Sequence, residues 1–232
     1  MREIVIDTET TGLEPGDGHR VVEIGALELV NHMPTGRIFH SYLNPERDMP
    51  ADARLVHGLT AAFLGEQPRF AEVAEDFLAF VDPDRADGIE PTQLVIHNSA
   101  FDVAFLNYEL ARLGLPRVDL GRRVVDTLEL ARQRFPGAPA SLDALCRRFA
   151  VDATARIRHG ALLDAELLAE VYLALIGGRQ PDLGLVVAHA ERVAVLIRER
   201  VPRAPRPHAP TPEELAAHQT FLMLLKDPIW LI

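Results

Sequence analysis

Alternating and β-branched hydrophobic runs dominate the first part of the chain and predict three consecutive antiparallel strands. The runs are EIVID at 3–7, VVEIGALELV at 21–30 and GRIFHSYLN at 36–44, and Gly, Pro and Asn separate them. Two later apolar runs, QLVIHN at 93–98 and RVVDT at 123–127, predict two more strands.

Apolar residues at the spacing of one helical face recur after the third strand. They predict helices at 69–81, 99–114, 127–135, 142–150 and 160–176. Ser99 and Ser141 are the expected N-caps, and Gly114 is the expected stop. Three strands followed by strand–helix alternation indicate an α/β fold, in which helices pack on a mixed sheet.

The composition changes near residue 177. Residues 1–176 contain 17 Arg and 28 Asp or Glu, whereas 177–211 contain 6 Arg and 3 acidic residues. The stretch VPRAPRPHAPTP at 201–212 has five prolines, which suits an extended linker. We therefore expect one domain at 1–176 and a flexible linker and tail at 177–232.

Bulk properties narrow the class of protein. The 48% hydrophobic content is that of a globular chain, and no apolar run approaches the roughly 20 residues of a membrane span. The chain enters a strand at once, without the features of a signal peptide, so we expect a cytoplasmic protein and no membrane contact. The single cysteine, Cys146, is expected on the buried face of a helix. The net charge of −10 argues against a broad basic surface for nucleic acid, unless metal ions or a partner supply positive charge.

The chemistry of the sequence lies in four carboxylates. Asp7 and Glu9 end the first strand and, two residues apart, point to the same side of it. Asp102 falls in the first turn of a predicted helix that follows a buried strand, and Asp164 falls in the first turn of the helix expected from Gly160. Each acid alone has an ordinary interpretation, as a solvated turn residue or as a complement to a helix dipole.

Together, the four acids could converge on one pocket, where they would repel one another unless cations lay between them. Mg²⁺ and similar ions prefer such oxygen ligands, and two ions about 3.5–4 Å apart form a clamp for attack at phosphorus. His159 precedes the last helix and suits the removal of a proton from water, although a lone histidine is also an ordinary loop residue.

Three motifs, IDTETTGL, HNSAFD and HGALLD, carry a family resemblance in this order. They resemble the DEDD superfamily of 3′-to-5′ exonucleases, in the variety that uses histidine. RHGALLDAELLAEVYLAL and VHGLTAAFLGEQPRFAEVAEDFLAFV are most similar to the epsilon, or proofreading, subunits of bacterial DNA polymerase III. The resemblance covers residues 1 to about 176; beyond them the tail is similar only in kind.

The resemblance implies a ribonuclease H-like fold with a five-stranded sheet and two Mg²⁺ or Mn²⁺ ions. The implied metal ligands are Asp7, Glu9, Asp102 and Asp164, with His159 as the general base. The product would be a nucleoside 5′-monophosphate released from a single-stranded or frayed 3′ end of DNA. Positions that would hold or flank the terminal nucleotide are Thr8, Leu13, His57, His97 and Asn98. By itself, His57 is also a plausible turn-capping residue.

The tail resembles a set of docking segments. In QPDLGL at 180–185, Gln180, Leu183 and Leu185 are similar to short peptides that bind the replication sliding clamp, although a plain loop would explain them equally well. Near the C-terminus, apolar residues that include Phe221, Leu224 and Trp230 are too many to leave in water. By resemblance their partner is the polymerase alpha subunit; the alternative is that they fold back on their own domain.

Two other functions stay open at this point. One is a free-standing exonuclease that trims RNA or repairs DNA, which would have no reason to carry the apolar C-terminus. The other is a catalytically idle subunit that steadies a polymerase, which would not need all four acids and His159.

Overall fold

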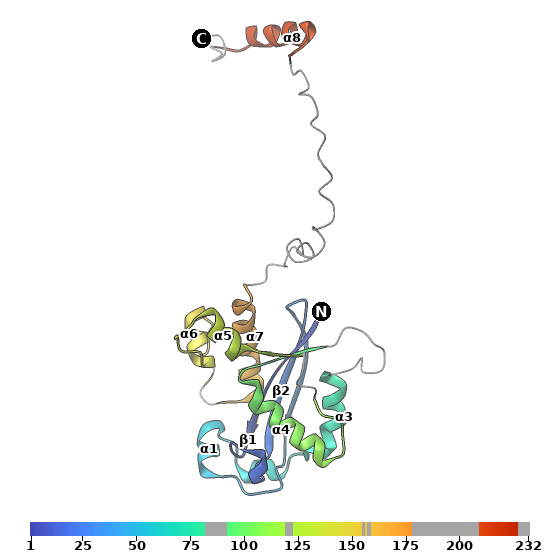
Figure 1. The fold of residues 1–232 in the computed structure, drawn as a ribbon, viewed down its shortest axis with the longest axis vertical. Helices are drawn as coiled ribbons and strands as arrows, with labels where there is room; N and C mark the ends of the chain where they lie inside the picture. Colours follow the sequence, from blue (N-terminus) through green and yellow to red (C-terminus); the bar gives the residue numbers. More distant parts are fainter. Residues whose placement is uncertain (82–91, 119–122, 155, 157–158, 178–208, 227–232) are drawn as a thin grey trace, which may run out of the picture. The chain divides into compact units, whose positions relative to one another are not determined.

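The computed structural model describes residues 1–81, 92–118, 123–154, 156, 159–177 and 209–226 (Figure 1). The chain divides into two compact units, Met1–Pro181 and Asp182–Ile232. In the described part of the second unit, helix α8 spans Pro212–Met223. The predicted docking residues Gln180, Leu183, Leu185 and Trp230 lie outside the described residues.

A five-stranded mixed sheet forms the centre of the first unit. Its strands are β1 (Arg2–Thr10), β2 (Val21–Val30), β3 (Met33–Tyr42), β4 (Gln93–Ile96) and β5 (Val124–Asp126). The spatial order is β3-β2-β1-β4-β5, in which β1, β2 and β3 pair antiparallel and β4 and β5 join in parallel. The predicted mixed sheet of five strands is confirmed.

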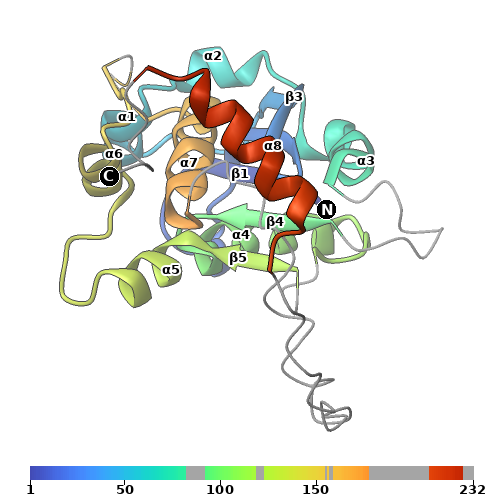
Figure 2. The same cartoon turned by 90° about the horizontal axis from the view of Figure 1, so that it is seen from above.

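Helices cover both faces of this sheet (Figures 1 and 2). Ile4 and Ile6 of β1 pack with α3 (Phe70–Val81) and α4 (Ser99–Arg112). Val5 packs on the opposite face with α5 (Thr127–Arg134), α6 (Leu142–Phe149) and α7 (Ala161–Leu175). Cys146 of α6 is buried in this second core, as predicted. None of the helices in the described part of the chain is long and apolar enough to cross a membrane.

Three local features differ from the sequence prediction. The N-cap of α4 is Asn98 rather than Ser99, because Asn98 takes a left-handed conformation with φ 60° and α4 starts directly after it. Strand β3 begins at Met33, earlier than predicted, in a mostly exposed segment without an alternating pattern. Two short helices, α1 (Ala51–His57) and α2 (Ala61–Gly65), were not predicted, because helices of one or two turns contain too few residues to show a periodic face.

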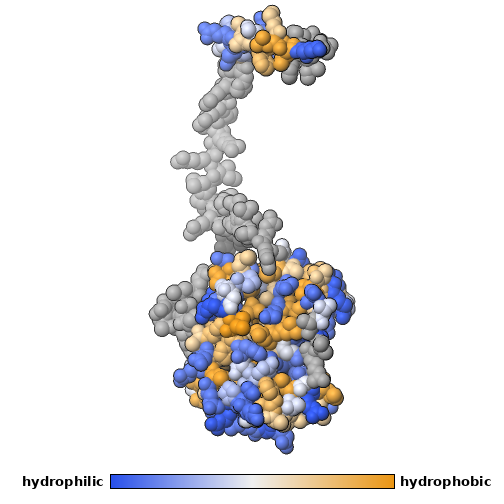
Figure 3. Space-filling view, turned by 180° about the vertical axis from the view of Figure 1, so that it is seen from behind, coloured by the Kyte–Doolittle hydropathy of each residue, from blue (hydrophilic) through white to orange (hydrophobic). Residues whose placement is uncertain are grey.

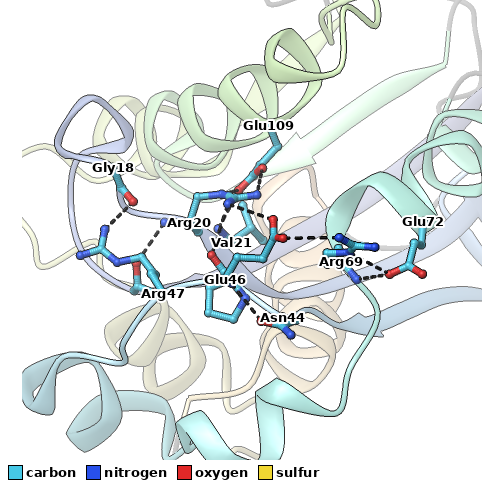
Figure 4. Close-up of polar contacts among 11 residues, drawn as sticks. Gly18, Arg20, Val21, Asn44, Glu46, Arg47, Arg69, Glu72 and Glu109 are labelled. Atoms are coloured by element: carbon cyan, nitrogen blue, oxygen red, sulfur yellow. Dashed lines mark hydrogen bonds and ion pairs between the residues drawn. The ribbon is translucent and has the colours of Figure 1, made fainter.

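A buried ion pair ties the start of β2 to α4. The Arg20 guanidinium donates from Nε to Glu109 Oε1 at 2.6 Å and from NH2 to Glu109 Oε2 at 2.8 Å (Figure 4). Arg20 also donates to the Pro45 carbonyl oxygen at 3.2 Å and lies 3.8 Å from Glu46. Since a buried charge is tolerated only when it is paired and hydrogen-bonded, this bidentate pair holds α4 against the sheet in one register.

Gly25 sets how closely α7 approaches the sheet. Gly25 of β2 lies opposite Asp7 of β1, and a Cβ atom at position 25 would stand 2.3 Å from the backbone of Ala161, the first residue of α7. Such a distance is well inside van der Waals contact. The absence of a side chain at position 25 therefore allows the first turn of α7, which carries Asp164, to lie directly over β2 beside β1.

We expect Gly25→Ala to move the first turn of α7 away from the sheet. Overpacking of this kind costs about 1–3 kcal/mol in the free energy of unfolding. Gly65→Ala is the control, since a Cβ there would meet nothing within 4 Å. Urea unfolding measures the effect. Unchanged stability in Gly25→Ala would contradict close packing at this position.

Candidate active site

Strand alternation sends the side chains of β1 to two different helices. Odd-numbered positions share the face of Val5, which packs with α7, so Asp7 and Glu9 face the α7 side. Even-numbered positions face α4, and accordingly both the backbone N–H and the hydroxyl of Thr8 donate to Asp102 Oδ1, at 3.0 and 2.7 Å. One strand end thus meets the first turns of two helices from opposite faces.

Asp102 is placed by the turn between β4 and α4. The backbone N–H groups of Asn98 and Ser99 donate to the carboxylate of Asp126, at 3.1 and 2.9 Å. Asp126 is also the N-cap of α5 and accepts from the N–H of Leu128 at 2.9 Å. This single carboxylate therefore fixes the left-handed turn at Asn98 and the start of α4, in whose first turn Asp102 is buried.

Asp164 and His159 come from the start of α7 and the residues before it. Asp164 is buried in the first turn of α7, and its Oδ2 lies 3.3 Å from Nδ1 of the exposed His159 ring. Because His159 precedes the N-cap Gly160, it is free of the helical geometry and reaches the same pocket as Asp164.

One cleft brings all five predicted catalytic residues together. Its volume is about 430 Å³. The predicted residues that line it are Asp7, Glu9, Asp102, His159 and Asp164, together with Thr8, Leu13, His97 and Asn98. Ligand atoms of Glu9, His159 and Asp164 all lie within 4.8 Å of one another. Carboxylate oxygens gathered in this way are the donor set of Mg²⁺ or Mn²⁺, so the residues present fit a divalent cation.

The electrostatics of the cleft show the same need for positive charge. Loss of hydration, followed by the charges of Asp102, Glu9 and Asp164, raises the pKa of Asp7 well above its usual range. Burial and then the charge of Asp164 raise the pKa of Glu9 to about 8. Burial likewise raises the pKa of Asp102 to about 7, although hydrogen bonds from Thr8 oppose the shift. Without a cation, these acids are therefore held partly protonated near neutral pH.

Arg156 is a residue of this cleft that the sequence analysis missed. Its guanidinium donates from Nε to Asp164 Oδ1 at 2.5 Å and from NH2 to Asp164 Oδ2 at 2.6 Å. NH2 also lies 2.7 Å from His159 Nδ1, and NH1 donates to Asp143. Arg156 stands three residues before His159 in a segment without periodicity. The available signal was only its place two residues before the motif RHGALLD, which begins at Arg158.

The predicted nucleotide-holding residues lie in and beside the cleft. Leu13 is 79% exposed at its rim. A second hollow, of about 730 Å³, shares Thr8, Glu9 and Leu13 with the cleft and is also lined by His57. His57 Nδ1 accepts from the Leu59 N–H at 3.1 Å, in agreement with a turn-capping role, whereas its buried Nε2 has no hydrogen-bond partner among the described residues.

His97, Asn98 and Thr8 are already engaged with neighbouring protein groups. His97 Nδ1 lies 2.9 Å from the Thr127 hydroxyl, and burial lowers the pKa of His97. The backbone N–H of Asn98 is bound to Asp126, and that of Thr8 to Asp102. These contacts orient the acidic cluster, and Thr8, His97 and Asn98 all line the cleft.

Comparison with known proteins assigns the class of this fold and site. Residues 4–172 match the family described as RNase_T, Exonuclease. The nuclease domain of 3′hExo, a DEDDh family member bound to rAMP, is similar with a TM-score of 0.63 and 18% identity over 75% of this chain and 91% of that one. Exonuclease X in complex with 5′ overhanging duplex DNA has a TM-score of 0.57 and 22% identity over 75% and 90%. At these identities the two structures show a shared fold.

Curated relatives narrow the assignment. DNA polymerase III subunit epsilon of Rickettsia felis is 48% identical over 227 residues, covering 96% of both chains. The subunit of the same name from Escherichia coli K12 is 42% identical over 236 residues, covering 97% of this chain and 93% of that one. The chain therefore belongs to the DNA polymerase III epsilon-subunit family of exonucleases. The family and the exonuclease activity predicted from the three motifs, and the ribonuclease H-like fold that they imply, are confirmed.

The raised carboxylate pKa values predict how stability depends on pH in the absence of metal. Between pH 4.5 and 8 the folded protein holds a proton on Glu9 that the unfolded chain releases, so the free energy of unfolding falls as pH rises through this window. Glu9→Gln has no titratable group at position 9, so it does not lose stability in this way as pH rises. We expect the variant, in EDTA, to be more stable than the original protein at pH 8 by on the order of 1–3 kcal/mol, and the gap to close toward pH 5.

Urea unfolding in EDTA at pH 5, 6.5 and 8 measures this difference. Glu75→Gln, on the exposed face of α3, is the control and should shift stability equally little at all three values. A Glu9→Gln protein that is no more stable than the original at pH 8 would show that burial and the neighbouring acids do not raise the pKa of Glu9 in the folded state.

Proposed function

We propose that this exonuclease removes mispaired 3′-terminal nucleotides from DNA during replication, as the proofreading subunit of DNA polymerase III. The observation that carries the proposal is the convergence of four carboxylates and His159 on one cleft. The reaction is hydrolysis of the terminal phosphodiester, which releases a nucleoside 5′-monophosphate.

Two Mg²⁺ or Mn²⁺ ions, held by Asp7, Glu9, Asp102 and Asp164, would neutralise the scissile phosphate and stabilise the charge that develops on it. His159, at the open side of the cleft, takes the proton of the attacking water. The charges of Asp102, Glu9 and Asp164 all raise the pKa of Asp7, so Asp7 would help to hold a cation bound among these acids.

Features around the cleft favour a single strand as the substrate. Leu13 projects at the rim, where an apolar side chain can stack on or wedge against a terminal base. A third hollow, of about 520 Å³, shares His97, Asn98 and Ser141 with the cleft and is lined by Arg132. Within the described residues Arg132 makes no hydrogen bond or ion pair, so it is available to the phosphates of an entering strand.

Residues 1–176 form the exonuclease domain in this proposal, and 177–232 form the tail that binds the polymerase. Helix α8 carries exposed apolar side chains, which Figure 3 shows gathered on its visible face. Phe221 is 56% exposed and Leu224 is 80% exposed. Groups of this size need a partner surface, and we assign it to the polymerase alpha subunit. Residues 180–185 are assigned to the sliding clamp.

Tethering explains how a protein of net charge −10 works on DNA. A polymerase bound through the tail holds the nuclease near the primer end at a high effective concentration, so the nuclease needs little affinity of its own for DNA. The cations in the cleft supply the local positive charge. The free-standing exonuclease is disfavoured by the apolar face of α8, and the idle subunit by the complete set of acids.

The metal site is tested by replacing Asp7 and Glu9 with Ala in one protein. We expect the loss of two metal ligands to lower digestion of a 3′-mismatched primer in Mg²⁺ by at least 10³-fold. The Glu75→Ala protein serves as the control, because Glu75 is exposed on α3. Undiminished digestion by the double variant would eliminate the proposed site.

The tail is tested by ending the chain after Arg200. The shortened protein retains the whole sheet and its helices, so it should digest single-stranded 3′ ends at the original rate. It should no longer co-purify with the polymerase alpha subunit, because α8 and the residues after it are gone. Persistent co-purification would show that the polymerase binds elsewhere on the protein.

A further inference from the structure

Arg156 binds the carboxylate of Asp164, which the proposed function assigns to a metal ion. Its fork binds both carboxylate oxygens of Asp164, at 2.5 and 2.6 Å, and its side chain is only 9% exposed. Arginine cannot be deprotonated in proteins and offers donors only. A bidentate pair of this kind occupies one lone pair on each oxygen of Asp164 and places a positive charge where a cation would bind.

The same guanidinium also blocks the proposed general base. Since NH2 of Arg156 can only donate, the 2.7 Å contact means that His159 Nδ1 accepts, and its lone pair is then unavailable. The third nitrogen, NH1, donates to Asp143 of α6. Arg156 thus engages a metal ligand and the base together, and it is anchored outside the cluster through Asp143, whose side chain is 52% exposed.

We propose that Arg156 is an internal counter-ion that keeps the metal-free site closed and that a divalent cation must displace from Asp164. This inference rests on the proposed function, because it takes Asp164 as a metal ligand and His159 as the base. When the Arg156 guanidinium leaves Asp164, both Asp164 oxygens and the His159 Nδ1 lone pair become free together. Asp143 then retains the guanidinium at the edge of the cleft. The chain therefore becomes active only when it is loaded with metal.

The proposal predicts effects of opposite sign on stability and on metal affinity. Removing the cation from a buried pair leaves Asp164 uncompensated beside Asp7 and Glu9, so the metal-free protein loses stability. The metal no longer competes with the guanidinium for the same oxygens, so it binds more tightly. A residue that merely positioned Asp164 for the metal would give the reverse result, with weaker metal binding on its removal.

The experiment uses the full-length chain with Arg156→Ala, and with Arg112→Ala as the matched control. Arg112 lies at the C-terminal end of α4, and Asp102 lies in the first turn of the same helix. Calorimetric titration with Mn²⁺ alone should give a dissociation constant about fivefold or more lower for Arg156→Ala than for the original protein. The midpoint of thermal unfolding in EDTA should fall more for Arg156→Ala than for Arg112→Ala, which within the described residues loses only a contact with the Tyr108 ring, and the dissociation constant should stay unchanged for Arg112→Ala.

A second measurement needs no unstable variant. In the original protein the Nε–H of Arg156 is hydrogen-bonded to Asp164, so it should give a protected NMR signal in EDTA, assigned by its absence from Arg156→Lys. Saturating Mg²⁺ should shift or abolish that signal.

The outcomes separate this inference from the proposed function. An unchanged signal in Mg²⁺, or equal or weaker Mn²⁺ binding by Arg156→Ala, would overturn the counter-ion even if the original protein digests 3′ ends. Absence of Mn²⁺ binding to the original protein would overturn both. Displacement of Arg156 by metal in a protein that does not remove mispaired 3′ nucleotides would uphold the counter-ion and refute the proofreading function.

Discussion

The crowding of carboxylates in one cleft is the constraint on which the structure of this protein depends. Four acids from three distant parts of the chain line the cleft, where burial and neighbouring charges raise the pKa values of Asp7 and Glu9, and the fold tolerates these acids only if protons or cations lie among them. In the metal-free protein the raised pKa values of Asp7, Glu9 and Asp102 reflect the protons, and Arg156 is the cation. A site with this concentration of carboxylates favours the binding of a divalent cation.

The rest of the fold supplies the rigidity that keeps the acids together. Alternation along β1 directs Asp7 and Glu9 to one face and Thr8 to the other, so a single strand end contacts the first turns of α4 and α7. The bare backbone at Gly25 lets α7 lie close to the sheet. Asp126 fixes the turn into α4, and the Arg20–Glu109 pair holds the body of that helix. Each of these features fixes the position of a strand or a helix, so the acids cannot move apart to relieve their repulsion.

An acidic exonuclease gains selectivity from these features. A nuclease with a broad basic face would bind any DNA, whereas the described lining of this cleft holds Arg156 among several acids. Under the proposed function, binding through residues 177–232 would decide which 3′ ends the nuclease meets. The cleft lies in the unit Met1–Pro181, and helix α8 lies in the unit Asp182–Ile232.

Much of this was readable from the sequence, because local patterns report local structure. The alternation of IVIDTET placed Asp7 and Glu9 on one side of a strand, and the motifs HNSAFD and HGALLD marked Asp102, His159 and Asp164. The order of strands and helices indicated the mixed sheet. The prediction from sequence missed short or irregular features. These are the helices α1 and α2, which are too brief to show a period, and the left-handed Asn98 in place of a Ser99 cap.

The sequence by itself indicated the four acids and the histidine that meet in the cleft and which faces of the elements are buried, because both follow from side-chain type and spacing of a few residues. Only the tertiary structure decided that Arg156 closes onto Asp164 and His159, that Gly25 admits α7, and that Asp126 orients the turn before Asp102. These contacts join segments whose separation in space depends on how the helices dock on the sheet. No short-range pattern along the chain encodes that separation.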